Sequence, residues 1–344
     1  MDDFRLTVLN PLGHDAEQEF RNLPAPGEGE HAPINFHAFA ACTQGAFHRN
    51  PRRAIAESTP VLLLLRGDLR ASERALADLK KQGRTVVVSL KETGLHQIAR
   101  QLCDRSKLTR FMRILAQADG CIATTPEAAE IYQSSRCGLG RVAFIPTPYP
   151  IEDQRWNFCV PPHEQFGIFV GTREWDVPSR NHFAALLVAR QLSEVTGESV
   201  TVVNLDGNKG RRLLAELKIP AKKLRVIEKW KLYPEYLRDV ARHKIVLQLD
   251  RSHVPGQVAG DALLCRVPCA GGDGAIDRIA FPKTCGDGRT ISEIASIALD
   301  LLQNADLRGA IVAASEKRAL EQLSFQAVRS QLAEFFAHVA QEHR

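Results

Sequence analysis

The 344-residue sequence lacks the features that mark secreted, membrane-spanning and nucleic-acid-binding proteins. Its longest apolar runs, such as residues 61–65, are far shorter than the ~20 residues that cross a bilayer. The acidic start at residues 1–4 lacks the basic and apolar regions of a signal peptide, and no Asn-x-Ser/Thr glycosylation acceptor occurs. The chain has 45 Lys and Arg against 40 Asp and Glu, so its net charge is only +5. Neither half of the sequence is a basic arm of the kind that binds nucleic acid.

Cysteine pairs of the kind that bind zinc are also missing. The eight cysteines include no CxxC pair, and eight is few for a disulfide framework in a chain of this length. We therefore expect buried thiols in a reducing compartment and no metal site. Together with the missing signal and membrane segments, this predicts a soluble, cytoplasmic protein.

What the sequence does contain is a regular alternation of β-rich runs and helical patterns, over a length that suits two domains of ordinary size. In the first half the expected strands are residues 6–9, 34–36, 61–65, 85–90, 120–124 and 142–145. The expected helices are residues 73–82 with Ser72 as N-cap, 95–118 with a break near Arg105, and one that begins at Thr125-Pro126. Such alternation predicts a parallel sheet covered by helices on both faces.

The pattern is interrupted at residues 146–163, where five prolines indicate a linker, and it then resumes. The expected strands of the second half are residues 167–170, 200–205, 224–228, 245–249 and a short one near Cys269. The expected helices are 180–195, 209–217, 233–242, 257–265, 291–303, 306–322 and 325–343. We therefore predict an α/β protein with Rossmann-type domains at residues 1–150 and 151–323. The C-terminal helix, residues 324–344, carries an apolar stripe that predicts core packing.

Common catalytic motifs are missing from the chain. GxxxxGK[ST], GxGxxG, HExxH and GxSxG do not occur, which disfavours P-loop, dinucleotide-binding, metalloprotease and hydrolase chemistry. Residues 271–274 read Gly-Gly-Asp-Gly, which fits either a phosphate-binding loop or a simple turn after a strand. The functional argument therefore rests on two other segments.

The first of these segments runs from His253 to Pro268, after a predicted buried strand. Ligands bind at the carboxyl ends of strands in open α/β sheets, so this loop is well placed. Gly256, followed by Gln257, lets an anion approach the start of the next helix. The Asp261 carboxylate could accept hydrogen bonds from both hydroxyls of a ribose. Alternatively, Asp261 is simply a solvated acidic residue of a helix. His253 lies at most ~12 Å from Asp261 if the intervening residues are helical, and it either faces a ligand or bonds locally.

The second segment begins at Gly171, at the end of the predicted strand 167–170, and contains Arg173 and Arg180. A cation at a helix start opposes the helix dipole, so Arg180 is explained by a bound phosphate or by a partner such as Glu174 or Asp176. Two arginines converging on a diphosphate would also stabilise a departing nucleotide without a metal ion.

Taken together, the two segments resemble the retaining GT-B glycosyltransferases of the large family-4-like group. Residues 261–268, Asp-Ala-Leu-Leu-Cys-Arg-Val-Pro, are similar to that family's Glu-Ala-Met-Ala-Cys-Gly-x-Pro segment. A Glu precedes that segment by eight positions in the family, and His253 stands there in this chain. Arg173 and Arg180 resemble the two cations that hold the donor diphosphate. The resemblance covers residues 166–285; in the first domain it rests on element order and on the run 144–148.

This resemblance implies two domains facing a cleft, a C-terminal helix across their junction, and transfer of a sugar with retention from a nucleoside diphosphate sugar. It also implies that the base lies near Trp230, which either stacks on it or packs over the sheet edge. By the strand-end rule, three loops of the first domain should bind the acceptor or the sugar. Their candidate residues are Gly13, His14, Arg66, Lys91 and Glu92.

The predicted function is therefore glycosyl transfer from a nucleoside diphosphate sugar to a hydroxyl acceptor, with no metal and no other cofactor. Two alternatives remain open. One is a non-catalytic sugar-nucleotide-binding or assembly subunit, because His253 replaces the family's Glu. The other is a sugar-nucleotide epimerase of the same fold.

Overall fold

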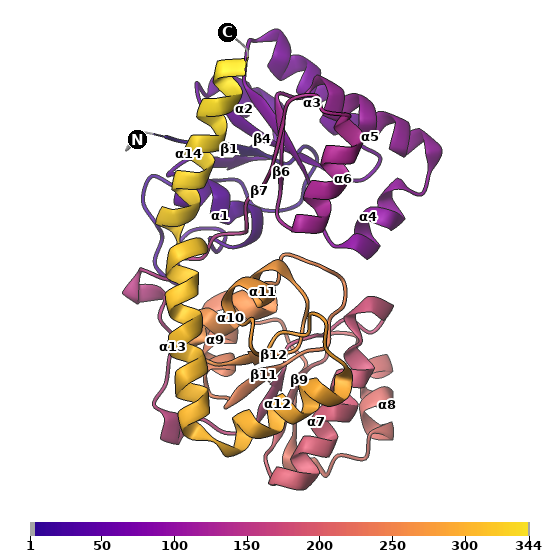
Figure 1. Ribbon diagram of the computed structural model, residues 1–344, viewed down its shortest axis with the longest axis vertical. Coiled ribbons are helices and arrows are strands. Elements are labelled where there is room, and N and C mark those ends of the chain that lie inside the picture. Colours follow the sequence, from indigo (N-terminus) through magenta and orange to yellow (C-terminus); the bar gives the residue numbers. More distant parts are fainter. Residues whose placement is uncertain (1–3, 343–344) are drawn as a thin grey trace. The chain divides into compact units, whose positions relative to one another are not determined.

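The computed structural model describes residues 4–342, and its contacts divide the chain into two compact units (Figure 1). The first unit runs to Glu152 and resumes at Gln322, and the second unit covers Asp153–Glu321. The C-terminal helix thus belongs to the first unit. Each unit is built around its own sheet, which confirms the predicted α/β class with two parallel-sheet domains.

The sheet of the first unit has the strand order β2-β3-β1-β4-β5-β6-β7, in which only β2 pairs antiparallel. Its strands are β1 (Thr7–Leu9), β2 (Gln18–Glu19), β3 (Ala46–His48), β4 (Val61–Leu65), β5 (Val86–Leu90), β6 (Gly120–Ala123) and β7 (Arg141–Phe144). Its helices are α1 (Asn35–Cys42), α2 (Pro51–Ala56), α3 (Arg70–Lys81), α4 (Leu95–Leu102), α5 (Arg105–Gln117), α6 (Pro126–Arg136) and α14 (Phe325–Glu342). Strands β4 and β5 are buried along their whole length, as expected of central parallel strands covered on both faces.

The sheet of the second unit has the order β10-β9-β8-β11-β12, and all of its pairs are parallel. Its strands are β8 (Ile168–Val170), β9 (Val200–Val203), β10 (Leu224–Ile227), β11 (Ile245–Leu247) and β12 (Cys269–Ala270). Its α-helices are α7 (His182–Thr196), α8 (Asn208–Glu216), α9 (Tyr233–Ala241), α10 (Gln257–Cys265), α11 (Ala275–Ala280), α12 (Ile291–Gln303) and α13 (Ala305–Gln322). Short 3-10 turns are η1 (Gln154–Trp156), η2 (Pro162–Glu164), η3 (Pro178–Arg180) and η4 (Ala221–Lys223).

Two helix starts follow the sequence signals closely. Thr125 precedes α6, and its hydroxyl accepts a hydrogen bond from the Ala128 N–H at 3.2 Å. The break predicted near Arg105 separates α4 from α5, where the Asp104 carboxylate accepts hydrogen bonds from the N–H groups of Ser106 and Lys107.

Other local predictions are wrong, each for a tertiary reason. Residues 34–36, predicted as a strand, enter helix α1, which is buried beside β1 and β3 in the same core. Ser72 is not an N-cap: helix α3 begins at Arg70, and the buried Ser72 hydroxyl donates to the Leu64 carbonyl. Strand β3 and helix α11 are short elements that the periodicity did not reveal.

Helix α14 completes the core of the first unit. The apolar stripe predicted as core is confirmed, because these side chains are buried against residues such as Leu6, Val8 and Leu62: Phe325, Val328, Leu332, Phe335, Phe336 and Val339. Glu152 caps the helix, since its carboxylate accepts hydrogen bonds from the N–H groups of Phe325 and Gln326. Helix α14 therefore folds as one body with the sheet of the first unit.

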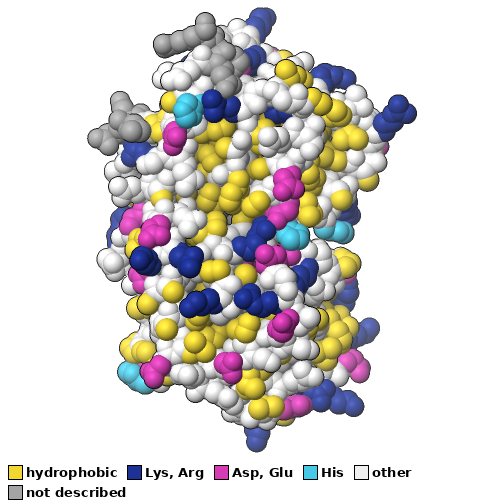
Figure 2. Space-filling model, viewed as in Figure 1, with side chains coloured by type: hydrophobic (Ala, Val, Ile, Leu, Met, Phe, Trp, Pro, Cys, Tyr) yellow, Lys and Arg dark blue, Asp and Glu magenta, His cyan; other side chains and the backbone are white. Residues whose placement is uncertain are grey.

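All eight cysteines are free thiols, but burial holds for only five of them, because Cys103, Cys137 and Cys159 are exposed. Within residues 4–342, no helix is long and apolar enough to cross a membrane. On the face shown in Figure 2, basic and acidic side chains lie interspersed among polar and apolar ones. This mixed surface agrees with the small net charge of the sequence.

Candidate functional site

A pocket of about 160 Å³ opens in the second unit where β8 and β11 end. Sequential strands β8, β9 and β10 build one side of the sheet, whereas β11 and β12 lie on the other side of β8. The strand order therefore reverses between β8 and β11, which is the point where open α/β sheets form their ligand crevice. The lining comes from the loop after β8, the loop after β11, and helices α9 and α10: Gly171, Thr172, Arg173, Glu174, Arg180, Tyr236, Gln248, Asp250, Val254, Gly256, Gln257, Val258 and Asp261.

Two glycines let backbone segments approach closely at this pocket. A Cβ on Gly171 would lie 2.3 Å from Cγ1 of Val258, so any larger residue would separate the end of β8 from α10. Gly256 precedes α10 with φ +95°, in the left-handed region that favours glycine, and a Cβ there would lie 2.9 Å from Oδ2 of Asp277. The pocket therefore lies beside a helix N-terminus, where backbone N–H groups and the helix dipole favour an anion.

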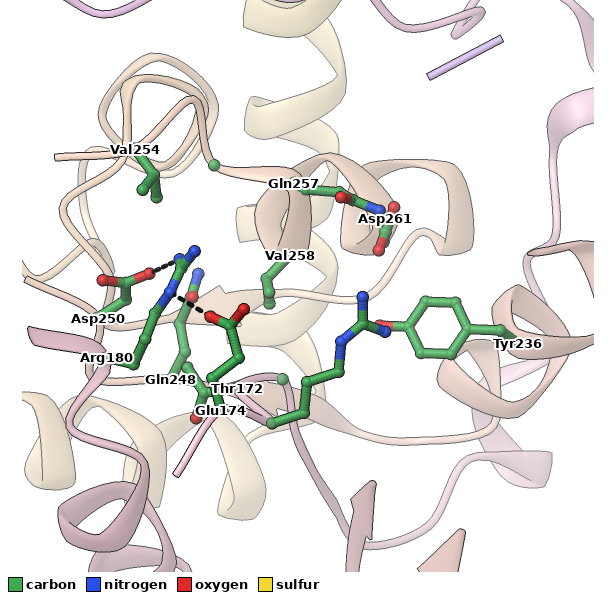
Figure 3. Close-up of a pocket in the computed structure, with 13 residues that line it drawn as sticks. Thr172, Glu174, Arg180, Tyr236, Gln248, Asp250, Val254, Gln257, Val258 and Asp261 are labelled. Carbon is green, nitrogen blue, oxygen red and sulfur yellow. Dashed lines mark hydrogen bonds and ion pairs between the residues drawn. The ribbon is translucent and has the colours of Figure 1, made fainter. Parts of the chain in front are cut away.

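Arg180 lies on one side of the pocket between two carboxylates (Figure 3). Its Nη1 donates to Oδ2 of the buried Asp250, and its Nε lies 2.7 Å from Oε2 of Glu174. Burial alone would lower the pKa of the Arg180 guanidinium, but Asp250 and Glu174 raise it above its ordinary value. Of the two partners suggested by the sequence, Glu174 is confirmed and Asp176 is wrong, because Asp176 binds Lys209 instead. Arg180 also belongs to the turn η3 and not to the first turn of α7.

Asp261 lies on the other side of Val258 in Figure 3, near Tyr236. The carboxylate is buried, so the predicted alternative of a solvated helix acid is wrong. Tyr233 donates to its Oδ1 at 2.6 Å. Burial raises the pKa of Asp261 to about 7, and hydrogen bonds from Tyr233 and Tyr236 and the charge of Arg173 lower it only in part.

The two arginines therefore have different surroundings. The Arg173 guanidinium lies over the ring of Trp230 with 5.6 Å between its Cζ and the ring centroid, and its charge acts on Asp261 and Tyr236. Arg180, in contrast, is held by Asp250 and Glu174. The pocket thus contains one arginine with an aromatic partner and one with two acidic partners.

Two further residues proposed from the sequence do not line the pocket. Trp230 is 77% exposed and reaches the site only through Arg173. The His253 backbone has φ +47°, its N–H donates to Oδ1 of Asp273 at 2.9 Å, and its Nε2 lies 3.4 Å from Oδ2 of the same residue. The residue after it, Val254, does line the pocket. Residues 271–274 form a bent loop after β12, in which Gly271 and Gly272 have positive φ, and they do not line this pocket.

The first-unit candidates lie in the loops after β1, β4 and β5, which are neighbours in the sheet: Gly13, His14, Arg66, Lys91 and Glu92. Contacts join these loops. The Arg66 Nη1 donates to the Leu12 carbonyl at 3.0 Å, and the Lys91 Nζ lies 3.4 Å from Oδ2 of Asp15. His14 and Glu92 are exposed.

Sequence reasoning missed several residues that line the pocket or hydrogen-bond to its lining. Asp250 follows a predicted strand, so the rule that ligands bind at strand ends could have identified it. Tyr233 and Tyr236 belong to no motif, and they reach Asp261 only because α9 packs on α10. Glu174 was considered only as a counter-ion of Arg180. Its position on the pocket wall depends on the path of the loop after β8.

No family model and no curated protein matches the sequence. Solved structures do match over most of the chain, and those described next are at most 15% identical to it. S. aureus TarM, solved with UDP and alpha-GlcNAc-glycerol, is 12% identical with a TM-score of 0.61, over 80% of this chain and 55% of that one. An O-GlcNAc transferase variant from Thermobaculum terrenum is 11% identical with a TM-score of 0.60, over 98% and 68% of the two chains. These matches decide the fold. The chain has the GT-B glycosyltransferase fold.

A GT-B structure of another kind also matches, a protein assigned as a UDP-N-acetylglucosamine 2-epimerase of Listeria monocytogenes. It is 15% identical with a TM-score of 0.53, over 85% of this chain and 78% of that one. The chain spans about half the length of the TarM chain. At these identities the likeness establishes the GT-B fold alone, so chemistry has to be argued from the pocket.

Proposed function

We propose that this GT-B chain transfers a sugar from a nucleoside diphosphate sugar to a hydroxyl acceptor, with retention and without a metal ion. The observation that carries the proposal is the pocket at the switch point between β8 and β11. It combines two arginines, a helix N-terminus and a buried carboxylate, each suited to a different part of one ligand. We also propose that the protein acts in the cytoplasm, in glycan biosynthesis. The eight free thiols support the cytoplasmic location, because cysteines stay reduced there.

Each group has a role in this proposal. Arg180 and the N-terminus of α10 hold the diphosphate and stabilise the charge that grows on it as the sugar leaves. Arg173 adds a second positive charge, and Trp230 beside it stacks on the base. The second oxygen of Asp261 accepts a ribose hydroxyl while Tyr233 holds the first oxygen. Gly171, Gly256 and Gln257 line the pocket beside these groups.

We assign the sugar side to His253, and the acceptor or sugar contacts of the first unit to Gly13, His14, Arg66, Lys91 and Glu92. What supports the second assignment is that these residues lie at the carboxyl ends of adjacent parallel strands, joined by the contacts of Arg66 and Lys91. No residue is assigned to a metal.

The test is a product analysis with radiolabelled sugar nucleotides, preceded by a thermal-shift screen of UDP, GDP, ADP, CMP and dTDP. Transfer predicts a labelled glycoside with an acceptor, and slow release of free sugar without one. Epimerised free sugar or sugar nucleotide would instead support the epimerase alternative, which the Listeria match favours. Nucleotide binding with neither product would support a non-catalytic subunit.

A further inference from the structure

Glu174 is a carboxylate on the wall of a pocket for which we propose an anionic ligand. It follows Arg173 in the loop after β8, and its Oε2 lies 2.7 Å from Nε of Arg180. In Figure 3 it reaches toward Arg180 from the side opposite Asp250. Both carboxylates therefore hold the guanidinium that the diphosphate would need.

The two carboxylates differ in how firmly they are held. Asp250 is 3% exposed at its side chain, and it accepts a hydrogen bond from the Ser252 N–H at 2.8 Å as well as one from Arg180. The Glu174 side chain is 50% exposed, so turning it away from Arg180 into solvent costs little free energy. Asp250 is thus a fixed counter-ion, whereas Glu174 is one that an incoming anion can replace.

The loop does not need Glu174 to keep its shape. The Arg251 N–H donates to the Ser179 carbonyl at 2.7 Å, and the Ser252 hydroxyl donates to the Ser179 hydroxyl at 2.7 Å. The Asn181 amide donates to the Leu249 carbonyl at 3.0 Å. These bonds attach the loop after β8 to the loop after β11 independently of the Glu174 carboxylate.

We propose that Glu174 occupies the anion position of Arg180 in the ligand-free chain, and that a bound diphosphate displaces it. The inference rests on the proposed function and adds to it a residue that competes with the ligand for Arg180. A ligand has to compensate for the lost contact between Glu174 and Arg180. A diphosphate does so because it reaches both Arg180 and the N-terminus of α10, whereas a single phosphate makes fewer contacts. Glu174 therefore lowers the affinity of any anion that takes this position, and a diphosphate compensates for the loss through its additional contacts.

The experiment compares the calorimetric affinities of inorganic pyrophosphate and inorganic phosphate for the parent chain, Glu174→Gln and Asp176→Asn. Gln keeps the size of the side chain and removes its charge. Asp176 is the matched control, because it lies two residues along the same loop, is exposed, and binds Lys209 outside the pocket lining. Glu174→Gln should bind pyrophosphate about threefold to fivefold more tightly, the upper part of the range expected when one partly exposed ion pair no longer has to be broken.

Phosphate affinity should rise by about the same factor, because both anions displace the same carboxylate. Asp176→Asn should change either affinity less than about twofold. Equal gains in both variants would show a general charge effect and would overturn the proposal, as would no gain in Glu174→Gln. If no variant binds either anion, freeing Arg180 has not created an anion site and the inference also fails. Glycosyl transfer by the parent chain decides the proposed function separately.

Discussion

Tyr233 donates its hydroxyl hydrogen to Oδ1 of Asp261 at 2.6 Å, inside a pocket where Asp261 is almost completely buried. The hydrogen bond stabilises the ionised carboxylate, as does the charge of Arg173, yet burial still raises the pKa of Asp261 to about 7. The group is therefore poised between its two forms near neutral pH. A ligand hydroxyl that donates to Asp261 would favour the ionised form.

The raised pKa predicts how stability depends on pH. Between its ordinary pKa of 3.8 and about 7, Asp261 keeps its proton in the folded chain and releases it in the unfolded chain. Its contribution to the free energy of unfolding is therefore greatest below pH 3.8, falls as pH rises, and is constant above pH 7. Asp261→Asn has no such group, so its stability relative to the parent should increase by on the order of 3 kcal/mol from pH 4 to pH 7.

Urea unfolding at several pH values measures this difference, with the exposed Asp287→Asn as control. The control should follow the parent at every pH. A constant difference between Asp261→Asn and the parent would show that folding does not raise the pKa of Asp261.

The second prediction separates the ribose from the phosphates. Asp261→Asn should weaken binding of the nucleoside diphosphate by about 1–3 kcal/mol, because a charge-assisted hydrogen bond to a ribose hydroxyl is lost. Pyrophosphate has no ribose, so its affinity should change less than about twofold. Calorimetry with both ligands on both chains measures this. An equal loss for both ligands would place Asp261 near the phosphates instead.

The fold was accessible from the sequence because its signals are local and repeated. Buried strands such as β4 and β5 read as continuous apolar runs, and α6 carries both its cap and its first-turn proline. Helix α1 was not accessible, since a short apolar segment fits a strand as well as a helix until its neighbours are known. Only packing decided between them.

The site was accessible in part for a related reason. Gly171, Gly256, Arg173, Arg180 and Asp261 follow strand ends or resemble motif positions, and they do line one pocket. The pairing of Arg180 with Asp250 joins residues 70 positions apart, and the contact of Tyr233 with Asp261 joins residues 28 positions apart. Such contacts depend on how loops and helices pack, which sequence spacing does not encode.

The third prediction concerns metal ions. Arg173 and Arg180 supply fixed positive charge at the pocket, and the sequence has no Asp-x-Asp pair in a strand-end loop. Transfer activity should therefore stay within about twofold after treatment with EDTA and removal of the chelate. Activity that disappears with EDTA and returns with Mn²⁺ would contradict a metal-independent reaction.

The fourth prediction concerns His253. Its φ of +47° is tolerated by asparagine, so His253→Asn removes the imidazole with little strain in the loop. If the imidazole acts on the donor sugar, kcat should fall at least about tenfold while the affinity for the nucleoside diphosphate is unchanged. The exposed His163→Asn is the control and should behave as the parent. An unchanged kcat would contradict a role of the His253 imidazole in the transfer step.

The last prediction concerns the two arginines, whose effect should be larger on turnover than on binding of the ground state. Charge on the leaving diphosphate is greatest in the transition state, so a guanidinium that contacts it contributes most there. Lysine keeps the positive charge beside Asp250, so the buried carboxylate is not left unpaired. Lysine lacks the planar fork of the guanidinium. Arg180→Lys and Arg173→Lys should each lower kcat/KM by at least about tenfold, which is less than the ~100-fold loss that follows when such a donor is removed altogether.

Arg190→Lys is the matched control, because Arg190 forms a partly exposed pair with Glu194 on α7, outside the pocket lining. It should leave kcat/KM within about twofold of the parent. If both pocket arginines act on the same phosphate oxygens, the double variant should lose less than the product of the two single losses. Steady-state kinetics and the nucleotide Kd of all four variants give the comparison. Changes of only a few-fold in both pocket variants would make Arg173 and Arg180 structural cations, and the proposed transfer reaction would lose its main physical support.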